Sequence, residues 1–246
     1  MPVLRAERLT KSFNSRVVVR KLSLELRTGE IVGLLGRNGA GKTTTFQMMV
    51  GLVRPDSGRI ILDGTDISRM TTCSRANHGI TYLPQEGSAF LKASVEDNLK
   101  LILEFLPLTR QARREVGRGL LRELGLLGLA EQSADSLSGG ERRRLEIARA
   151  LVLNPKFLLL DEPFTGIDPL TIVELQKIML RLRDKGIGIV LTDHNVRDTF
   201  KIVNRACIID EGEVLIEGAP SKLTADERAK ERFLGKDFEL GEEIQA

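Results

Sequence analysis

The sequence predicts an α/β fold with a mostly parallel core sheet, an antiparallel β subdomain and an inserted helical subdomain. Short apolar runs with the length of strands occur in the N-terminal part of the chain and return after residue 156. Helical patterns separate most of the later runs, and strands that alternate with helices form parallel sheets covered on both faces. Between these two regions lies a long stretch rich in Arg and Leu that has a helical pattern.

The N-terminal part contains strand patterns separated by turn signals. Leu22, Leu24 and Leu26 alternate with polar neighbours, as they would in a half-buried strand. The apolar run 31–35 is typical of a strand that is buried on both faces, and a Gly-rich loop and a helical stretch follow it. Turn signals surround the short run 60–62, so we expect an antiparallel hairpin there.

The rest of the chain divides into a helical region, a second set of strands and a tail. Helices are expected from about residue 95 to 153, and strands at 157–160, 187–191, 206–209 and 214–216. We expect one domain over residues 1–225, with the helical subdomain at about 88–156, and a C-terminal docking tail over 226–246. Four apolar residues of the tail could bury a small face: Phe233, Leu234, Phe238 and Leu240. The alternative is a solvated, partly frayed end.

Composition narrows the class of protein. Hydrophobic residues make up 41% of the 246 residues and charged residues 29%, which excludes a mainly disordered, collagen-like or coiled-coil chain. The net charge of +3 is too small to indicate nucleic-acid binding. Two cysteines cannot form a disulfide framework, which favours a reducing compartment. The N-terminus lacks the apolar stretch of a signal peptide and no membrane-spanning run is present, so we expect a cytoplasmic protein.

A phosphate-binding loop follows the apolar run 31–35. Residues 36–43 match the pattern G-x-x-x-x-G-K-[ST], and a helical stretch begins directly after them. In such a loop the glycines let backbone N–H groups converge on phosphate oxygens. Lys42 is expected at the β- and γ-phosphates, and the Thr43 hydroxyl at Mg²⁺. The candidate nucleotide-binding residues of this segment are Gly36, Arg37, Asn38, Gly39, Ala40, Gly41, Lys42, Thr43 and Thr44.

Two adjacent acids, Asp161 and Glu162, end the apolar run 157–160. Functional groups of parallel sheets gather at the carboxyl ends of strands. Adjacent residues at a strand end point in different directions, so the two acids need not share a role. We assign Asp161 to hold Mg²⁺, and Glu162 to act as the general base that polarises the attacking water.

A second candidate anion site is formed by residues 137–141, Leu-Ser-Gly-Gly-Glu. Ser138 is a natural helix N-cap and Glu141 can complete a capping box with it. Gly139 and Gly140 leave backbone amides uncovered at this helix start. An Arg-rich helix is expected over 142–153.

With these three motifs the chain resembles the ATP-binding-cassette (ABC) family of P-loop NTPases over residues 3 to about 225. The resemblance implies an ATPase that uses ATP and Mg²⁺, with residues 36–43 as Walker A, Asp161 and Glu162 at the end of Walker B, and 137–141 as the family signature. It further implies four roles outside those motifs. These are Gln85 as the Q-loop glutamine that senses Mg²⁺, Asp168 as the D-loop aspartate, His194 as the switch histidine at the γ-phosphate, and Phe13 as the adenine-stacking aromatic.

The family resemblance also implies partners. In this family two cassettes meet head to tail and enclose two ATP molecules, with Walker A of one copy facing the signature of the other. The chain carries one set of motifs, so we expect it to pair with a second copy or a second cassette. Soluble ABC ATPases that act on DNA or ribosomes are an alternative, but about 95 residues between Walker A and the signature leave no room for a long coiled coil. A GTP-dependent switch is disfavoured because no N-K-x-D element is present.

Four strings point to a transporter subtype: residues 82–86, 137–144, 192–196 and 233–238. They resemble the ATPases of lipopolysaccharide export, and the ATPases of branched-chain amino-acid importers are the alternative. This resemblance implies integral membrane subunits as partners, no nucleic acid, and a position on the cytoplasmic face of the inner membrane. Phe90 is a candidate contact for a membrane subunit. The arginines at 110, 113, 114, 118 and 122 form either a solvated helix face or a face toward anionic lipid.

Overall fold

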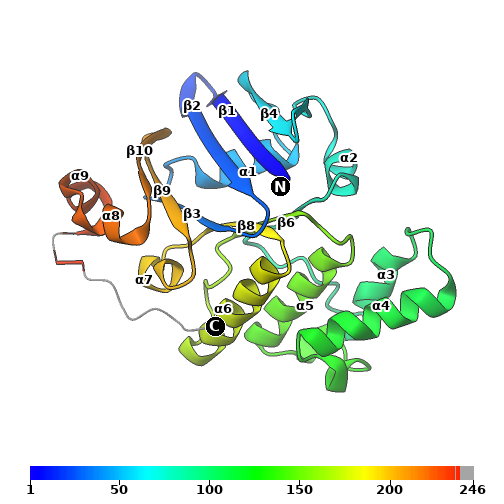
Figure 1. The fold of residues 1–246 in the computed structure, drawn as a ribbon. Coiled ribbons are helices and arrows are strands. Elements are labelled where there is room, and N and C mark those ends of the chain that lie inside the picture. The colour runs from blue at the N-terminus through cyan, green and yellow to red at the C-terminus, as the bar shows by residue number, and fades with distance from the viewer. Residues whose placement is uncertain (236, 239–246) are drawn as a thin grey trace.

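The computed structural model describes residues 1–235, 237 and 238, which form two sheets and a set of helices around them (Figure 1). The strands are β1 Val3–Phe13, β2 Arg16–Arg27, β3 Ile31–Gly36, β4 Ser57–Leu62, β5 Thr65–Asp66, β6 Ile80–Leu83, β7 Phe157–Asp161, β8 Gly188–Thr192, β9 Arg205–Asp210 and β10 Glu213–Gly218. The α-helices are α1 Lys42–Val50, α2 Thr72–Asn77, α3 Val95–Leu103, α4 Arg110–Glu123, α5 Gly139–Leu151, α6 Pro169–Asp184, α7 Val196–Phe200, α8 Pro220–Ala225 and α9 Glu227–Ala229.

The core sheet has the strand order β10-β9-β3-β8-β7-β6. Neighbouring strands from β9 across to β6 are all parallel, and β10 pairs antiparallel with β9. Every residue of β3, β7 and β8 is buried, because layers cover both faces of the sheet. The predicted mostly parallel α/β core is therefore confirmed.

The predicted antiparallel β subdomain is a separate sheet with the order β2-β1-β4-β5. It packs over one face of the core sheet together with α1, and Figure 1 shows it above the core strands, with α5 and α6 below them. β3 divides its side chains between the two layers. Val32 and Leu34 pack toward this sheet and α1, whereas Ile31 and Leu35 pack toward the helices on the opposite face.

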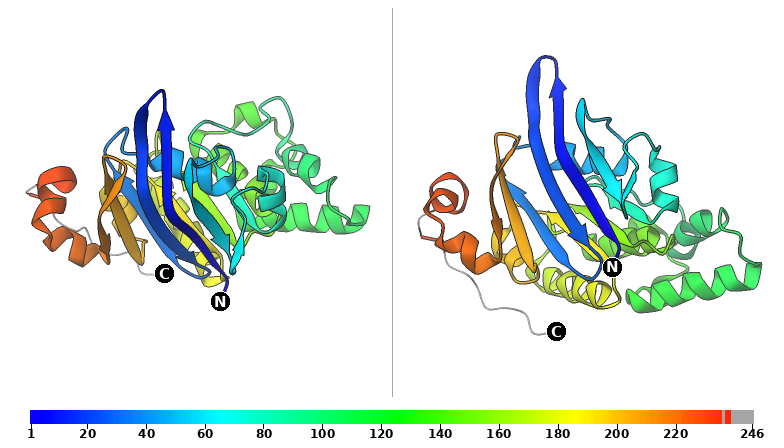
Figure 2. Two further views of the ribbon diagram at one scale, coloured as in Figure 1. Left: turned by 90° about the horizontal axis from the view of Figure 1, so that it is seen from above. Right: turned by 45° about the horizontal axis from the view of Figure 1, so that its top comes forward.

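The helical lobe of α3, α4 and α5 lies at the opposite end of the molecule from α8 and α9 (Figure 2). Ser94 caps α3 and Thr109 caps α4 with side-chain hydrogen bonds, so both helices begin where the sequence supplies a hydroxyl acceptor. α4 turns Gly117 and Leu121 inward, and four of its arginines stay exposed: Arg110, Arg114, Arg118 and Arg122. Within the described chain, no helix is both long and apolar enough to cross a membrane.

The described part of the predicted tail packs on the chain's own core. Ala229 is fully buried, and Phe233, Leu234 and Phe238 lie against the cluster beneath α6 and α7. The rings of Phe238 and Phe200 meet edge to face with centroids 5.9 Å apart. Leu240, the fourth apolar residue of the predicted docking face, lies outside the described residues.

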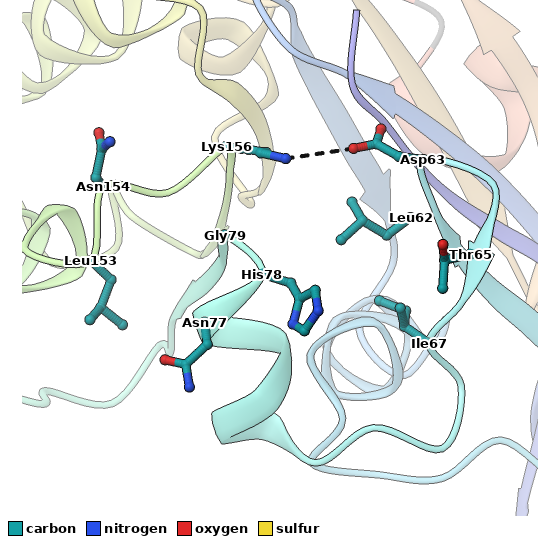
Figure 3. A pocket seen from close by; sticks show the side chains of 10 residues that line it. All are labelled: Leu62, Asp63, Thr65, Ile67, Asn77, His78, Gly79, Leu153, Asn154 and Lys156. Atoms are coloured by element: carbon teal, nitrogen blue, oxygen red, sulfur yellow. Dashed lines mark ion pairs between the residues drawn. The ribbon is translucent and has the colours of Figure 1, made fainter.

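A surface cavity of about 420 Å³ lies where the hairpin β4–β5 approaches the amino ends of β6 and β7. Figure 3 shows its lining side chains, with the Lys156 ammonium 3.6 Å from the Asp63 carboxylate across the opening. His78 borders it and bonds the Ser74 carbonyl through Nδ1. Gly79 and Lys156 precede their strands, so the cavity lies at the end of the sheet opposite to the motif residues described next.

Candidate active site

The phosphate loop joins β3 to α1 and leaves no room for side chains at its two ends. Gly36 has φ +155°, and a Cβ there would lie 2.3 Å from the Ile209 carbonyl oxygen. Gly41 has φ +102°, and a Cβ there would lie 2.8 Å from the Val18 carbonyl oxygen. These positions require glycine on both conformational and steric grounds. Gly41 is the N-cap of α1, so the loop closes directly onto a helix N-terminus.

Lys42 is buried inside this loop. Its ammonium donates to the Gly36 carbonyl at 2.8 Å and to the Arg37 carbonyl at 3.2 Å, and the residue is 6% exposed. Desolvation lowers the pKa of Lys42, although the carboxylates of Glu162, Asp161 and Asp193 oppose this shift. A buried cation whose partners are carbonyl dipoles is ready to receive an anion.

Asp161 ends β7 and is 1% exposed. Its Oδ1 accepts a hydrogen bond from the Thr192 hydroxyl at 2.7 Å, and the Thr43 hydroxyl lies 3.4 Å from the same atom. The Tyr82 hydroxyl donates to Oδ2 at 3.1 Å. Thr43 and Asp161 thus bring a hydroxyl and a carboxylate oxygen together beside the phosphate loop. This donor set fits Mg²⁺, which takes one or two protein oxygens and completes its shell with phosphate and water.

Glu162 is the point at which three segments meet. Gln85 Nε2 donates to its Oε2 at 2.8 Å, the Thr165 hydroxyl donates to the same oxygen at 3.1 Å, and His194 Nε2 lies 2.7 Å from Oε1. Its backbone has φ +48°, an uncommon conformation for a residue with a Cβ, and its N–H is held by the Thr192 carbonyl at 2.9 Å. The structure therefore brings Gln85 and His194 to the expected general base.

The next residue after β8, Asp193, fixes the loops on both sides of this cluster. It is 2% exposed, and its carboxylate accepts from the backbone N–H groups of Phe164 and Asn195. Burial raises the pKa of Asp193, and the two N–H donors oppose that shift. The segments that carry Glu162 and His194 are thereby tied to one carboxylate.

The signature residues form the N-terminus of α5, which begins at Gly139 rather than at the expected residue 142. The earlier start follows from the capping box: Ser138 Oγ accepts from the Glu141 N–H, and the Glu141 carboxylate accepts from the Ser138 N–H at 2.9 Å. The Ser138 hydroxyl holds the pKa of Glu141 below its usual value. Gly140 packs against Thr171 at the start of α6.

Two of the expected nucleotide contacts make no bond to Glu162 within the described chain. Asp168 is the N-cap of α6 and accepts from the Thr171 N–H at 3.0 Å. Phe13, at the end of β1, is 44% exposed and has the Lys11 ammonium 5.4 Å from its ring centroid. Among the described residues no hydrogen bond or ion pair joins the signature, Asp168 or Phe13 to the phosphate loop.

Sequence analysis missed a buried ion pair that connects three motifs. The Arg143 guanidinium bonds the Glu146 carboxylate at 3.0 Å, and both side chains are almost fully buried. Arg143 also donates to the carbonyls of Pro84 and Asp161, and Glu146 accepts from the Ser88 N–H. The signature helix is therefore bonded directly to the Gln85 loop and to β7. No local pattern in the sequence signals these long-range contacts.

The chain is similar to known proteins in both family and fold. The family model described as "ABC transporter" matches residues 19–165. Two relatives carry the name "Lipopolysaccharide export system ATP-binding protein LptB". The one from Acidithiobacillus ferridurans is 51% identical over 97% of this chain and 99% of its own length, and the one from Haemophilus influenzae is 50% identical over 98% and 100%. A solved structure described as an ATP-binding cassette of an ABC transporter superposes with a TM-score of 0.88 at 26% identity, covering 96% of this chain and 100% of its own.

Proposed function

Because the chain belongs to the ABC transporter family and is an ATPase of that family, we propose that it powers lipopolysaccharide export from the inner membrane. The cargo is proposed from the relatives named for lipopolysaccharide export, which match this chain at about half of all positions and over nearly its full length. The ATPase chemistry is supported above all by the convergence of Gln85 and His194 on Glu162.

We propose that the γ-phosphate of ATP is attacked by a water molecule that Glu162 polarises. The Glu162 carboxylate accepts the proton of that water as the new P–O bond forms, while the bond between the γ-phosphorus and the β–γ bridging oxygen breaks and ADP leaves. Gln85 and His194 hold the carboxylate in position, and His194 can also donate toward the γ-phosphate. Lys42 turns from its two carbonyl partners to the β- and γ-phosphates and compensates their negative charge.

Thr43 and Asp161 would hold Mg²⁺. When bound, this ion would neutralise phosphate charge and hold the phosphates in one geometry. Gln85 would respond to that ion through the same loop that Arg143 bonds at Pro84.

We further propose that two copies of the chain form the complete site. The N-terminus of α5, where Ser138 and Gly139 are exposed and Gly140 is buried, is a second anion site that makes no bond to the phosphate loop within the described chain. In a head-to-tail dimer it would supply amides to ATP bound by the partner, and Asp168 and Phe13 would contact nucleotide at or near that interface. ATP then stabilises the closed pair, and its hydrolysis lets the pair open.

The membrane partners are proposed to dock between the Gln85 loop and the helical lobe. Phe90 is 51% exposed there, with the Arg149 guanidinium 4.5 Å from its ring centroid. Phe90 lies at the end of the loop that begins with Gln85, so a partner that docks on Phe90 can shift Gln85 at the ATP site. We propose that these partners hold the chain on the cytoplasmic face of the inner membrane.

The experiment is affinity purification of the tagged chain from native membranes in mild detergent, followed by mass spectrometry. Membrane subunits together with a periplasm-facing component of lipopolysaccharide transport are the expected result. Permeases of an amino-acid importer would replace the proposed cargo, and ribosomal or DNA-associated partners would overturn the transporter assignment.

Glu162→Gln tests the chemistry in the same preparation. Loss of the general base should lower turnover by roughly a hundredfold to ten-thousandfold while ATP binding is kept. The subunit composition should be unchanged. Wild-type turnover in this variant would remove Glu162 from the role of base.

A further inference from the structure

Tyr82 contacts the proposed magnesium ligand from a neighbouring strand. It lies on β6, whose residues pair in parallel register with β7, and its hydroxyl donates to Asp161 Oδ2 at 3.1 Å. The other carboxylate oxygen, Oδ1, is bonded by Thr192 from β8 and faces Thr43 from α1. Both carboxylate oxygens of Asp161 are therefore held, Oδ1 by Thr192 and Oδ2 by Tyr82.

The ring of Tyr82 is itself fixed. It is half-buried against the cluster beneath the antiparallel sheet, and it meets Phe46 edge to face with centroids 6.5 Å apart. Phe46 is fully buried on α1, the helix that the phosphate loop opens. The hydroxyl that bonds Asp161 is thus carried by a side chain packed on the element that also carries Thr43.

We propose that Tyr82 is a positioning residue for the metal site: its hydroxyl fixes the orientation of the Asp161 carboxylate so that Oδ1 stays beside Thr43. This inference rests on the proposed Mg²⁺ role of Thr43 and Asp161. A carboxylate bonded at only one oxygen can rotate about its last C–C bond, whereas one bonded at both is pre-organised for a cation. Outer partners of this kind commonly change metal affinity by tenfold or more.

Tyr82→Phe removes the hydroxyl and keeps the ring. Thr81→Val is a matched control, because Thr81 lies next to Tyr82 on β6 and its buried hydroxyl has no partner in the described chain. Affinity for a non-hydrolysable ATP analogue is measured by calorimetry, first in EDTA and then across a Mg²⁺ titration. Mn²⁺ in place of Mg²⁺ gives an independent spectroscopic measure of metal binding.

For Tyr82→Phe we expect unchanged analogue affinity in EDTA and a half-saturating Mg²⁺ concentration raised about tenfold. Bound Mn²⁺ should fall in parallel, and turnover at saturating Mg²⁺ should return close to wild type. Thr81→Val should titrate as wild type. An unchanged Mg²⁺ midpoint in Tyr82→Phe, or an equal shift in Thr81→Val, overturns the proposal.

The EDTA measurement separates this proposal from the proposed ATPase function. If the wild-type chain does not bind the analogue at all, the proposed ATPase function is wrong. A changed Mg²⁺ midpoint, in contrast, concerns only the role of Tyr82. If Tyr82→Phe melts at a lower temperature, the amount of analogue bound in EDTA measures its folded fraction. The half-saturating Mg²⁺ concentration of that folded fraction then tests the role of Tyr82.

Discussion

At the scale of single residues, the charge of Lys42 in the phosphate loop opposes folding. Lys42 is buried with two carbonyl groups as partners, and desolvation lowers its pKa in the folded chain. A base whose pKa is lowered by folding carries a charge that opposes folding, so stability rises as the pH increases toward the unfolded pKa and the charge is lost. The proposed phosphate-binding role of Lys42 accounts for an ammonium group that does not stabilise the nucleotide-free chain.

Lys42→Met tests this trade at the residue scale. We expect loss of nucleotide affinity, together with a free energy of unfolding that is not lower than that of the wild type without nucleotide. Titration with an ATP analogue measures the first, and urea unfolding the second. A clear drop in stability would mean that the bonds to the Gly36 and Arg37 carbonyls outweigh the desolvation of the ammonium group.

At the scale of elements, two adjacent glycines at the start of α5 have different surroundings, and only Gly140 faces α6. A Cβ on Gly140 would lie 2.3 Å from Thr171 Cγ2, whereas a Cβ on Gly139 would meet Ile167 Cδ1 at 3.7 Å, an ordinary contact. Thr171 is β-branched and sits in the first turn of α6, so it has few rotamers with which to yield. Gly140 therefore sets how closely the two helices approach.

Gly140→Ala should destabilise the nucleotide-free chain by about 1–3 kcal/mol, because the start of α6 must shift to remove the overlap. Gly139→Ala is the control and should be close to neutral or slightly stabilising, since alanine favours the helix. Thermal unfolding of the two variants checks the difference. Equal melting temperatures would show that α6 accommodates the methyl group.

The sequence predicts the elements well and the contacts between them poorly. The buried run 31–35, the phosphate loop and the acids after residue 160 follow from local periodicity and spacing, and the structure agrees with each. The sequence predicts a helix over 142–153, after the motif 137–141, but the Ser138–Glu141 capping box makes α5 begin at Gly139. The Tyr82–Asp161 bond joins two strands, and the bonds of Arg143 to the Pro84 and Asp161 carbonyls join α5 to a loop and to β7. No local pattern encodes these long-range contacts.

For the molecule as a whole, the two cysteines differ in accessibility, so that thiol labelling can report separately on the surface and on the core. Cys73 is exposed on α2, and Cys207 is fully buried in β9 beside β3. Burial raises the pKa of Cys207 to about 12, so its thiol stays protonated and unreactive at neutral pH. Labelling of Cys207 therefore requires that the core sheet open.

In a Cys73→Ser background, the remaining thiol should react only on global unfolding. ATP analogue with Mg²⁺ at about a hundred times its dissociation constant should slow that labelling by roughly a hundredfold, because the ligand binds only the folded chain. Mass spectrometry after timed labelling measures the rate. Adding Lys42→Ala should abolish the effect of the nucleotide, and fast labelling of the folded wild type would contradict the buried position of Cys207.

The strand order of the core sheet has a consequence for how the chain is made. β8 lies between β3 and β7 in the sheet, although it follows both of them in the chain. Until residues 188–192 have emerged from the ribosome, the phosphate loop and the acids at 161 and 162 belong to two segments with no strand between them. The nucleotide pocket is therefore assembled late in synthesis. A nascent chain that stops before β8 leaves both edges of β3 and one edge of β7 unpaired and lacks a complete binding site.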